Sequence, residues 1–337
     1  MLRRVFLICA AIVVLLAFAA CTDGGNGGAP PVQQRAEPEA SPGGQPDDEA
    51  VTAALSEITV GISLMTLEHV FFQQIRDGFE AAAQQLGVRL IIMDARSQLD
   101  VQFTQVQDFI TQGVDAIVLA PVSVAGTSTM VERATDAGIP VFSLDNRSDG
   151  EVVSHVATDN YLGGRLAGQW VMENLLPDGG RMVIISMPGT ETGLMREAGF
   201  IDYLTENNSQ IEILGINNGE GAADVALAVM QDFITLFGDD IDAVYSVTDG
   251  MAIGAMSAIQ AADQDISIIG FGANPHGVAA IAEGGVFKAS VRQDPDAITY
   301  TALQSIVSHL GGEPIDSEHL IAPTVVYAAN VDNYLEP

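Results

Sequence analysis

The sequence predicts an α/β protein made of two doubly wound parallel sheets, and three observations lead to that fold class. From residue 57 onward, short apolar runs rich in β-branched residues alternate with amphipathic stretches of helical period. The short runs are almost continuously apolar, which is typical of parallel strands in a sheet covered by helices on both faces. Several amphipathic stretches end in glycine, which readily takes the left-handed conformation at a helix C-terminus.

The individual elements follow from these patterns in chain order. Strands are predicted at residues 58–64, 90–93, 116–120, 141–144, 152–157, 182–186, 211–214, 243–247, 268–271 and 287–291. Helices are predicted at residues 72–86, 99–111, 124–137, 161–175, 195–207, 224–236 and 251–262. Gly87, Gly113 and Gly138 follow three of these helices. The strands are more than one small doubly wound sheet needs, so we expect two lobes.

A crossover between the lobes is predicted near the fifth strand. Residues 155–160 span the end of that strand and lead into a helix with Asp159 or Asn160 as a potential cap. Ligands of open α/β sheets bind beyond the carboxyl ends of the strands. Two such sheets facing each other are therefore expected to form a cleft lined by the loops that follow strands.

The N-terminus has the pattern of an export signal. Residues 1–4 include two arginines, residues 5–17 form an apolar run, and Ala19-Ala20 precedes Cys21. The run is shorter than the ~20 residues of a membrane span, so we expect cleavage rather than retention. Residues 16–21 resemble a bacterial lipobox, with Phe18 where leucine is usual, which implies a signal peptide at 1–20 and lipidation of Cys21. The alternative is an ordinary signal peptide that contains a cysteine.

The segment after the cysteine is predicted to be a disordered tether, placed at residues 21–56. Residues 22–49 are rich in glycine, proline, glutamine and acidic residues and have almost no large apolar side chain. Apart from Cys21, the only cysteine is Cys9, which lies inside the predicted signal. The exported domain therefore has no disulfide and no thiolate metal site.

Charge excludes one class of partner. The formal net charge is −31, and Lys288 is the only lysine. A nucleic acid would be repelled by this field, and no basic patch with interleaved aromatic residues is present in the sequence. The acidic composition is consistent either with a salty habitat, where charge repulsion is screened, or with a bias of the whole lineage.

With the strands placed, the loops resemble those of the type I periplasmic sugar-binding proteins, in particular the ribose-binding group. The resemblance covers residues 57–334. It is strongest at residues 144–145 and 150–164, and it extends to residues 71–72, 77–78, 189–200, 229–231, 249–255, 270–272 and 293–295. It implies two lobes joined by a three-segment hinge, with lobe 1 at residues 57–158 and 294–322 and lobe 2 at residues 159–293 and 323–337.

The resemblance also implies a set of ligand-binding residues. These are Asp145, Arg196, Gln293, Phe71 and Phe72, together with four variable positions, His69, Asn146, Thr248 and Asn274. The ribose binders carry Asn-Pro-Phe-Phe where this chain has His69-Val70-Phe71-Phe72. They also carry Leu-Asp-Arg where it has Leu144-Asp145-Asn146, and a carboxylate where it has Gly272. These departures argue against ribose itself.

Physical chemistry supports these roles, with an alternative for each. Asp145 can accept hydrogen bonds from two adjacent hydroxyls, or it is a turn or capping carboxylate. Arg196 can donate a fork of hydrogen bonds across the cleft, or it is a surface arginine paired with Glu197 or Asp202. Gln293 can contact both lobes, or it is a solvated hinge residue.

The aromatic and histidine positions leave similar alternatives open. One or both of Phe71 and Phe72 can flank a sugar ring, and the alternative is that one of them only fills the core; Phe72 is slightly preferred for the ligand. His69 faces the ligand, or it lies on the rim or pairs with Glu68. The remaining histidines of the mature chain, at 155, 276, 309 and 319, lack metal-ligand spacing and are interpreted as structural.

Together these features predict a binding protein rather than an enzyme. The sequence has no Gly-x-Ser-x-Gly elbow, His-Glu-x-x-His motif or Walker loop, and it implies no metal and no cofactor. The expected function is capture of a sugar or polyol by a lipid-anchored, extracytoplasmic monomer that delivers it to an ABC permease. The alternatives are ligand sensing for a chemoreceptor or sensor kinase and, less favoured, a hydrolase or isomerase on the same fold.

Overall fold

The structure is a computed structural model that describes residues 58–335. The predicted signal peptide, Cys21 and the predicted tether lie outside the described residues. Within that part of the chain, no helix is both long enough and apolar enough to cross a membrane.

The first sheet has six strands, all parallel to their neighbours, in the order β11-β5-β4-β3-β1-β2. They are β1 (Thr59–Leu64), β2 (Arg89–Asp94), β3 (Ala116–Leu119), β4 (Val141–Leu144), β5 (Ser154–Thr158) and β11 (Glu318–Ile321). Side chains of β1, β3 and β4 are fully buried, which explains why these strands are continuously apolar.

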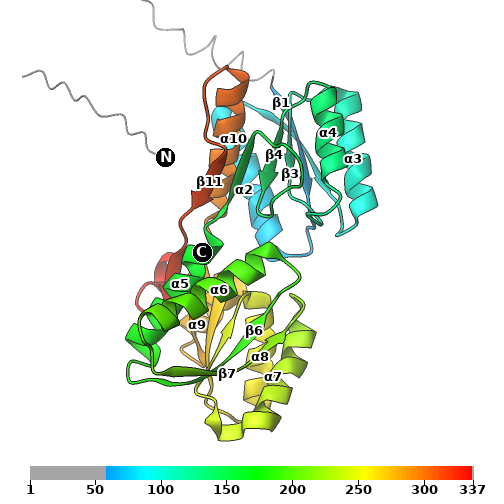
Figure 1. The fold of residues 1–337 in the computed structure, drawn as a ribbon. Helices are drawn as coiled ribbons and strands as arrows, with labels where there is room; N and C mark the ends of the chain where they lie inside the picture. The colour runs from blue at the N-terminus through cyan, green and yellow to red at the C-terminus, as the bar shows by residue number, and fades with distance from the viewer. Residues whose placement is uncertain (1–57, 336–337) are drawn as a thin grey trace, which may run out of the picture. The chain divides into compact units, whose positions relative to one another are not determined.

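Helices cover both faces of the first sheet, as Figure 1 shows. They are α2 (Val70–Leu86) and α10 (Pro295–Leu310) on one face, and α3 (Leu99–Gln112) and α4 (Ser128–Asp136) on the other. Phe79 of α2 and Leu303 of α10 share a core with β1, whereas Phe109 of α3 and Met130 of α4 belong to a separate core. We call this sheet with its helices lobe 1.

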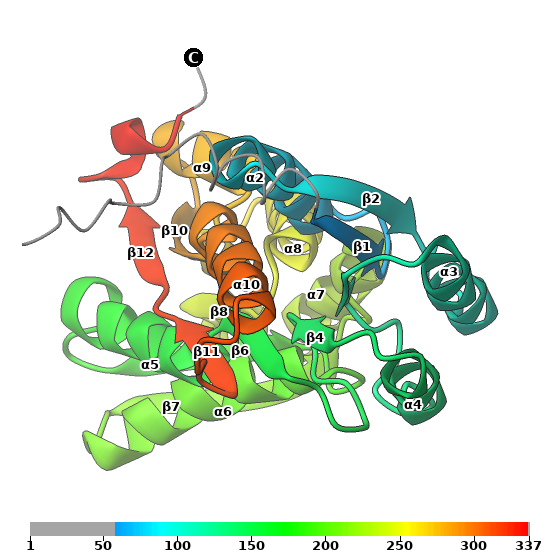
Figure 2. The same cartoon turned by 90° about the horizontal axis from the view of Figure 1, so that it is seen from above.

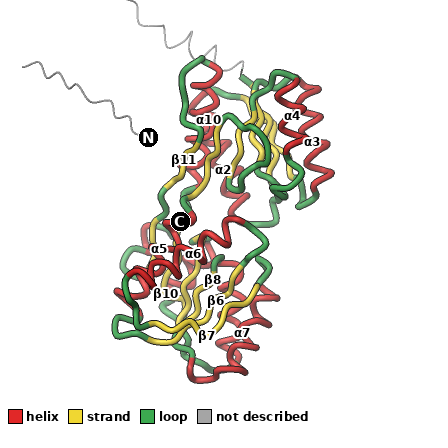
Figure 3. Tube along the Cα trace, viewed as in Figure 1, coloured by secondary structure: helices red, strands yellow, loops and turns green. Residues whose placement is uncertain are grey.

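The second sheet also has six strands, in the order β12-β10-β9-β8-β6-β7, and only β12 is antiparallel to its neighbour. They are β6 (Gly180–Ser186), β7 (Ile211–Asn218), β8 (Ala243–Ser246), β9 (Ser267–Gly272), β10 (Phe287–Arg292) and β12 (Thr324–Tyr327). This sheet and its helices form lobe 2, and Figure 3 shows the strands of the two lobes as separate groups.

The helices of lobe 2 pack in two sets. They are α5 (Asn160–Trp170), which ends in a π turn (Val171–Leu175), α6 (Glu191–Glu206), α7 (Ala223–Phe237), α8 (Asp249–Ala261) and α9 (Pro275–Ala282). Helix α5 packs on α6, and α7 and α9 both pack on α8. Figure 2 shows these two sets on opposite sides of the second sheet.

The chain passes between the lobes at three places: from β5 to α5, from β10 to α10, and from β11 to β12. The fold class predicted from the sequence, two doubly wound parallel-sheet lobes with a three-segment connection, is therefore confirmed. The crossover predicted at residues 155–160 is the first of the three.

The structure contains elements that the sequence pattern did not predict. No helix was predicted after residue 262, but α9 and α10 begin at Pro275 and Pro295, since proline is well tolerated in the first turn of a helix. Strands β11 and β12 have four residues each and are partly exposed, so they lack the continuous apolar pattern. The helix predicted at 124–137 is shorter, because residues 121–127 form a loop before α4.

Candidate ligand-binding cleft

A cleft of about 560 Å³ is lined by residues of both lobes. Its walls come from loops that follow strands, as expected for open α/β sheets. In lobe 1 the loops follow β1 and β4, and in lobe 2 they follow β6, β7, β8 and β9. The strand order reverses beside β1 in the first sheet and beside β6 in the second, so the cleft lies at the switch point of each lobe.

All nine ligand residues predicted from the sequence line this cleft. Phe72 is 3% exposed and belongs to the core of lobe 1, whereas Phe71 is only partly buried and packs edge-on against it. The slight preference for Phe72 as the ligand-facing ring is therefore not supported, because Phe71 has the more accessible ring. His69 is exposed and stands at the N-cap of α2 without a capping side-chain hydrogen bond.

The backbone of Asp145 has an unusual conformation. Its φ is 62°, in the left-handed region that aspartate tolerates better than most residues, and its backbone N–H donates to the Val156 carbonyl over 3.0 Å. Burial raises the pKa of the Asp145 carboxyl to about 6, while the Arg196 guanidinium acts in the opposite direction. Asn146, the next residue, donates to the Asp145 carboxylate over 3.3 Å.

Arg196 is 5% exposed and is fixed by three hydrogen bonds. Its Nε donates to Asn160 Oδ1 over 2.8 Å, one terminal nitrogen to the Val247 carbonyl over 3.0 Å, and the other to Gln293 Oε1 over 3.2 Å. Its guanidinium carbon lies 3.9 Å from the centre of the Phe271 ring.

The surface alternative for this arginine is therefore wrong. Its two proposed partners bond elsewhere, since Glu197 pairs with Ser186 and Asp202 with Tyr161. Burial lowers the pKa of the Arg196 guanidinium, and the Asp145 carboxylate opposes that effect. A guanidinium stays charged despite such burial, so a hydrogen-bonding cation lies at the wall of the cleft.

Gln293 is a buried residue between β10 and α10, so its interpretation as a solvated hinge residue is also wrong. Its Oε1 accepts from Arg196 and, over 3.0 Å, from the Thr158 hydroxyl. Because the carbonyl oxygen is used in this way, the amide NH₂ remains to donate toward the cleft.

Thr248 and Asn274 have capping roles that the sequence analysis did not assign. The Thr248 hydroxyl accepts from the Met251 N–H at the start of α8, and Asn274 Oδ1 accepts from the Gly277 N–H at the start of α9. Each side chain keeps one polar group for a ligand, the hydroxyl proton of Thr248 and the amide NH₂ of Asn274.

Several lining residues escaped prediction. Met65, Met187, Ile253 and Phe271 contribute apolar surface, and Thr190, Thr192, Glu220 and Asp249 contribute polar groups. His276, which the sequence analysis interpreted as structural, is exposed and lines the cleft, so that interpretation is wrong. The sequence pattern could have identified them, because each of these residues lies near the carboxyl end of a strand or in the first turns of the helix that follows.

Asp249 holds two neighbouring segments of the lobe 2 wall through hydrogen bonds to its carboxylate. Its carboxylate accepts from the Ser290 hydroxyl over 2.6 Å and from the Asn274 N–H over 2.8 Å. Burial raises its pKa to about 6, against the effect of these hydrogen bonds. A Cβ at Gly272 would lie 3.5 Å from Asp249 Oδ2, and Gly272 has a φ of +132°, which other residues rarely adopt.

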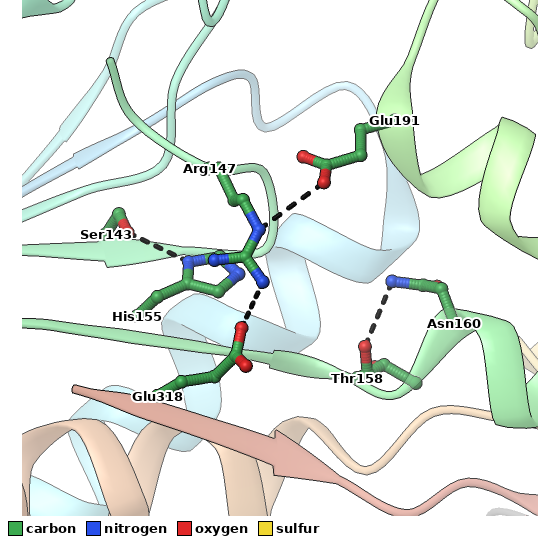
Figure 4. Close-up of polar contacts among 7 residues, drawn as sticks. All are labelled: Ser143, Arg147, His155, Thr158, Asn160, Glu191 and Glu318. Carbon is green, nitrogen blue, oxygen red and sulfur yellow. Dashed lines mark hydrogen bonds and ion pairs between the residues drawn. The ribbon is translucent and has the colours of Figure 1, made fainter. Parts of the chain in front are cut away.

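A smaller cavity of about 90 Å³ lies on the other side of Asp145. Arg147 lines it, and Figure 4 shows this side chain between Glu318 of lobe 1 and Glu191 of lobe 2. His155 also lines it, where burial and Arg147 lower the imidazole pKa to about 4. His155 accepts from or donates to the Ser143 hydroxyl over 2.8 Å, which agrees with a structural role.

The arrangement is suited to recognition. In residues 58–335, no three histidine or acidic side chains are grouped closely enough to hold a metal ion. The cleft instead combines an arginine, a carboxylate, amides, hydroxyls and aromatic faces, which bind and orient a polar molecule with an apolar face.

Comparison with known proteins identifies the family. A sequence profile described as "Periplasmic binding protein domain" matches residues 60–314. The chain belongs to the periplasmic binding protein family. Members of this family are extracytoplasmic solute-binding proteins rather than enzymes, so the expected class of function and the extracytoplasmic location are confirmed.

Individual relatives of this periplasmic binding protein agree with the assignment. The ribose import binding protein RbsB of Bacillus subtilis (strain 168) is 31% identical over 260 residues, which cover 77% of this chain and 84% of that protein. The Caulobacter myo-inositol binding protein, solved with myo-inositol, has a TM-score of 0.74 and 29% identity over 82% of this chain and 95% of its own. The binding protein of the arabinose ABC transporter from Shewanella sp. ANA-3, solved with L-arabinofuranose, has a TM-score of 0.75 and 28% identity over 82% and 94%.

Proposed function

We propose that this periplasmic binding protein captures an uncharged sugar or polyol in the cleft between its lobes and delivers it to an ABC importer. The observation that carries the proposal is that one carboxylate and one guanidinium, Asp145 of lobe 1 and Arg196 of lobe 2, line the same cleft and influence each other's pKa. Arg196 offsets the charge of Asp145, and the other charged groups that line the cleft, Glu68, Glu220 and Asp249, are acidic, so the site disfavours an anionic ligand. The partly buried ring of Phe71 supplies apolar surface for the C–H face of a sugar ring.

The relatives support the same class of ligand. The proteins compared above are named for ribose, myo-inositol and arabinose. The common feature of these molecules is a ring of hydroxyls on a small carbon skeleton. Ribose itself is disfavoured for this chain, because His69, Asn146 and Gly272 all differ from the ribose-binding pattern.

A thermal-shift screen tests the ligand class. Pentoses, hexoses, amino sugars, polyols and nucleosides would each be added to the purified protein. A ligand at 100 times its Kd adds about 2.7 kcal/mol to the free energy of unfolding, which gives a clear rise in the unfolding midpoint. The proposal expects such a rise with at least one neutral sugar or polyol. A rise with charged compounds only would contradict it.

Delivery requires that ligand binding changes how the lobes are arranged. A ligand that bonds to Asp145 on lobe 1 and Arg196 on lobe 2 favours the closed population, and the permease would recognise that form. We place lobe 1 at residues 57–158 and 294–322 and lobe 2 at residues 159–293 and 323–337, and we propose a monomer. Sensing for a chemoreceptor or sensor kinase uses the same binding step, so identification of the co-purified partner separates the two roles.

We further propose that the protein is anchored through lipid on Cys21, after removal of residues 1–20. The support is the sequence alone: the Ala19-Ala20-Cys21 ending and the polar segment that follows it. Acyl chains contribute about 0.8 kcal/mol per buried CH₂, so a multiply acylated terminus holds a protein at a membrane. Cys21→Ser, or inhibition of lipoprotein signal cleavage, should yield an unmodified protein. A mature N-terminus other than a modified Cys21 in mass spectrometry would contradict the anchor.

A further inference from the structure

Arg196 depends on a residue that lies outside the cleft. Of its two side-chain partners, Gln293 lines the cleft, but Asn160 lines only the smaller cavity on the other side of Asp145. Asn160 is 8% exposed and is the first residue of α5, directly after the chain has crossed from β5. It bonds to Arg196 through the shortest of the three hydrogen bonds that this guanidinium makes.

We propose that Asn160 is a positioning residue for binding: it fixes the plane of the Arg196 guanidinium, so that the donors left free point at the ligand. The inference rests on the proposed function, in which Arg196 contacts a hydroxylated ligand. It assigns to Asn160 a role in affinity without any contact to that ligand.

The geometry explains why one hydrogen bond has this effect. A guanidinium is rigid and planar, so a fixed Nε–H together with one fixed terminal nitrogen determines the direction of every other N–H. Asn160 holds the Nε–H at 2.8 Å, Gln293 holds a terminal nitrogen at 3.2 Å, and Phe271 packs against the face of the group. Without Asn160, rotation about the last side-chain bonds is opposed by fewer contacts, and part of the binding energy is lost in ordering the side chain.

Asn160 is itself held in place. Its Nδ2 donates to the Thr158 carbonyl over 3.0 Å, a bond drawn in Figure 4, so its Oδ1 faces Arg196. The Thr158 hydroxyl in turn bonds to Gln293, which also accepts from Arg196. Arg196 is thereby tied to the first crossover through Asn160 and to the second through Gln293.

The first test needs no ligand. The Nε–H signal of Arg196 in ¹H–¹⁵N NMR spectra is assigned by its absence from the spectrum of Arg196→Lys. In the wild type this Nε proton should exchange slowly with water. Asn160→Ala should remove that protection. Asn160→Asp keeps an oxygen acceptor and should restore it, which a general loss of stability would not do. The capping bond from the Leu162 N–H to Asp159 is retained in both variants, so α5 keeps its N-cap.

Asn174→Ala provides a matched control. Asn174 is an exposed asparagine that follows α5 and bonds only to the Trp170 carbonyl among the described residues. Its replacement should leave the Arg196 signal unchanged. An unchanged Arg196 signal in Asn160→Ala would overturn the inference, whatever the ligand is.

The second test measures affinity by calorimetry. Myo-inositol, D-ribose, L-arabinose and xylitol are tried with the wild type, and the compound that binds most tightly is used for all variants. Asn160→Ala should weaken binding about tenfold or more, as expected for loss of a hydrogen bond to a charged group. In an Arg196→Lys background the same change should have less than about a twofold effect, because its target is gone. Equal effects in both backgrounds would overturn the positioning role. If the wild type binds none of the four probes, the neutral ligand with the largest effect in the thermal-shift screen replaces them, and the Arg196 signal still decides the role of Asn160.

Discussion

At the residue scale, the cleft uses backbone conformations that most side chains avoid. Asp145 has a φ of 62° and Ala273, beside the lobe 2 wall, a φ of 43°. Such conformations persist where surrounding contacts hold them, here the Asp145 N–H bond to Val156 and the Ala273 N–H bond to Ser290. Asp145 lies in the loop after β4 and Ala273 in the loop after β9. Their backbone conformations set the course of these two loops, which line the cleft.

Asp145→Ala and Arg196→Ala should both weaken binding, but with different effects on stability. Loss of a charge-assisted hydrogen bond to the ligand costs about 1.5–3 kcal/mol of binding free energy in either variant. Arg196→Ala also removes the donor to Asn160 Oδ1 and to the Val247 carbonyl and one of the two donors to Gln293 Oε1, so it should lower the unfolding midpoint as well. Calorimetry and thermal unfolding measure the two effects. Wild-type affinity in both variants would remove these residues from the binding site.

Affinity should also depend on pH through Asp145. The pKa of this carboxyl is about 6 in the free protein, and a ligand hydroxyl that donates to it favours the ionised form. Binding should therefore be strongest above pH 6 and weaken as pH falls below that value, by up to tenfold per pH unit when the carboxyl must ionise on binding. Calorimetric titrations between pH 5 and pH 8 measure this dependence.

The matched variants separate the groups responsible. Asp145→Asn should abolish the loss of affinity at low pH. His69→Asn, at the exposed N-cap residue of α2 that lines the same cleft, serves as a second variant. An identical pH profile in the wild type and Asp145→Asn would assign the dependence to another group.

Many residues that line the cleft could be predicted from the sequence, because the polar residue directly after a buried strand lies at the edge of the sheet where ligands bind. Asp145 and Thr248 were found in this way with the help of the family pattern. Asn160 was recognised only as a potential helix cap, because its bond to Arg196 spans 36 positions in sequence and depends on how α5 packs on α6. No local pattern reports such a contact.

At the element scale, the position of Arg196 depends on a close contact between two helices. Gly164 of α5 lies against the Arg196 carbonyl, and Gly199 of α6 lies against the Tyr161 carbonyl. In both places a Cβ would overlap the backbone oxygen of the facing helix. These two glycines allow α5 and α6 to approach closely, and this approach brings Asn160 within reach of Arg196.

Gly199→Ala should therefore separate the helices and reduce both stability and affinity. Overpacking of this kind costs about 1–3 kcal/mol of unfolding free energy, even though alanine favours a helix over glycine. Gly285→Ala is the control, because a Cβ there meets nothing within 4 Å and its φ is not in the left-handed region. Thermal unfolding and calorimetry compare the two variants. Equal midpoints would show that α5 and α6 can repack at no cost.

The elements that sequence analysis missed share a physical cause. Strands β11 and β12 lie at the edges of their sheets, where burial on both faces is incomplete and the apolar pattern fades. The interior strands β1, β3, β4 and β8 are fully buried and were predicted almost to the residue. Periodicity reports burial, so it locates the core of each sheet better than its edges.

At the scale of the whole molecule, the excess of negative charge should make stability depend on salt. The chain has 44 acidic and 13 basic residues, so its folded state holds many like charges close together. Raising NaCl from 0.01 M to 0.15 M shortens the Debye length from about 30 Å to about 8 Å and weakens this repulsion. The unfolding midpoint should rise, by about 2–4 °C for each kcal/mol gained.

The ion pair between the lobes provides an internal comparison for that experiment. Arg147 bonds to Glu318 in lobe 1 and lies 3.4 Å from Glu191 in lobe 2, and its attraction to these carboxylates is weakened by the same salt. Arg147→Gln should lower the midpoint at low salt by an amount that shrinks as NaCl is added. A wild-type midpoint that falls as salt rises would show that such pairs outweigh the general repulsion.

The third connection between the lobes, from β11 to β12, affects when each lobe can complete its folding during protein synthesis. Strands β11 and β12 are the last strands in chain order, and they complete the edges of different sheets, beside β5 and β10. A ribosome therefore delivers the outer strand of both sheets only after all the other strands have been made, and neither lobe can finish folding early. This delay suits a chain whose first residues have the pattern of an export signal, because the emerging polypeptide stays incomplete during the interval in which such a signal acts.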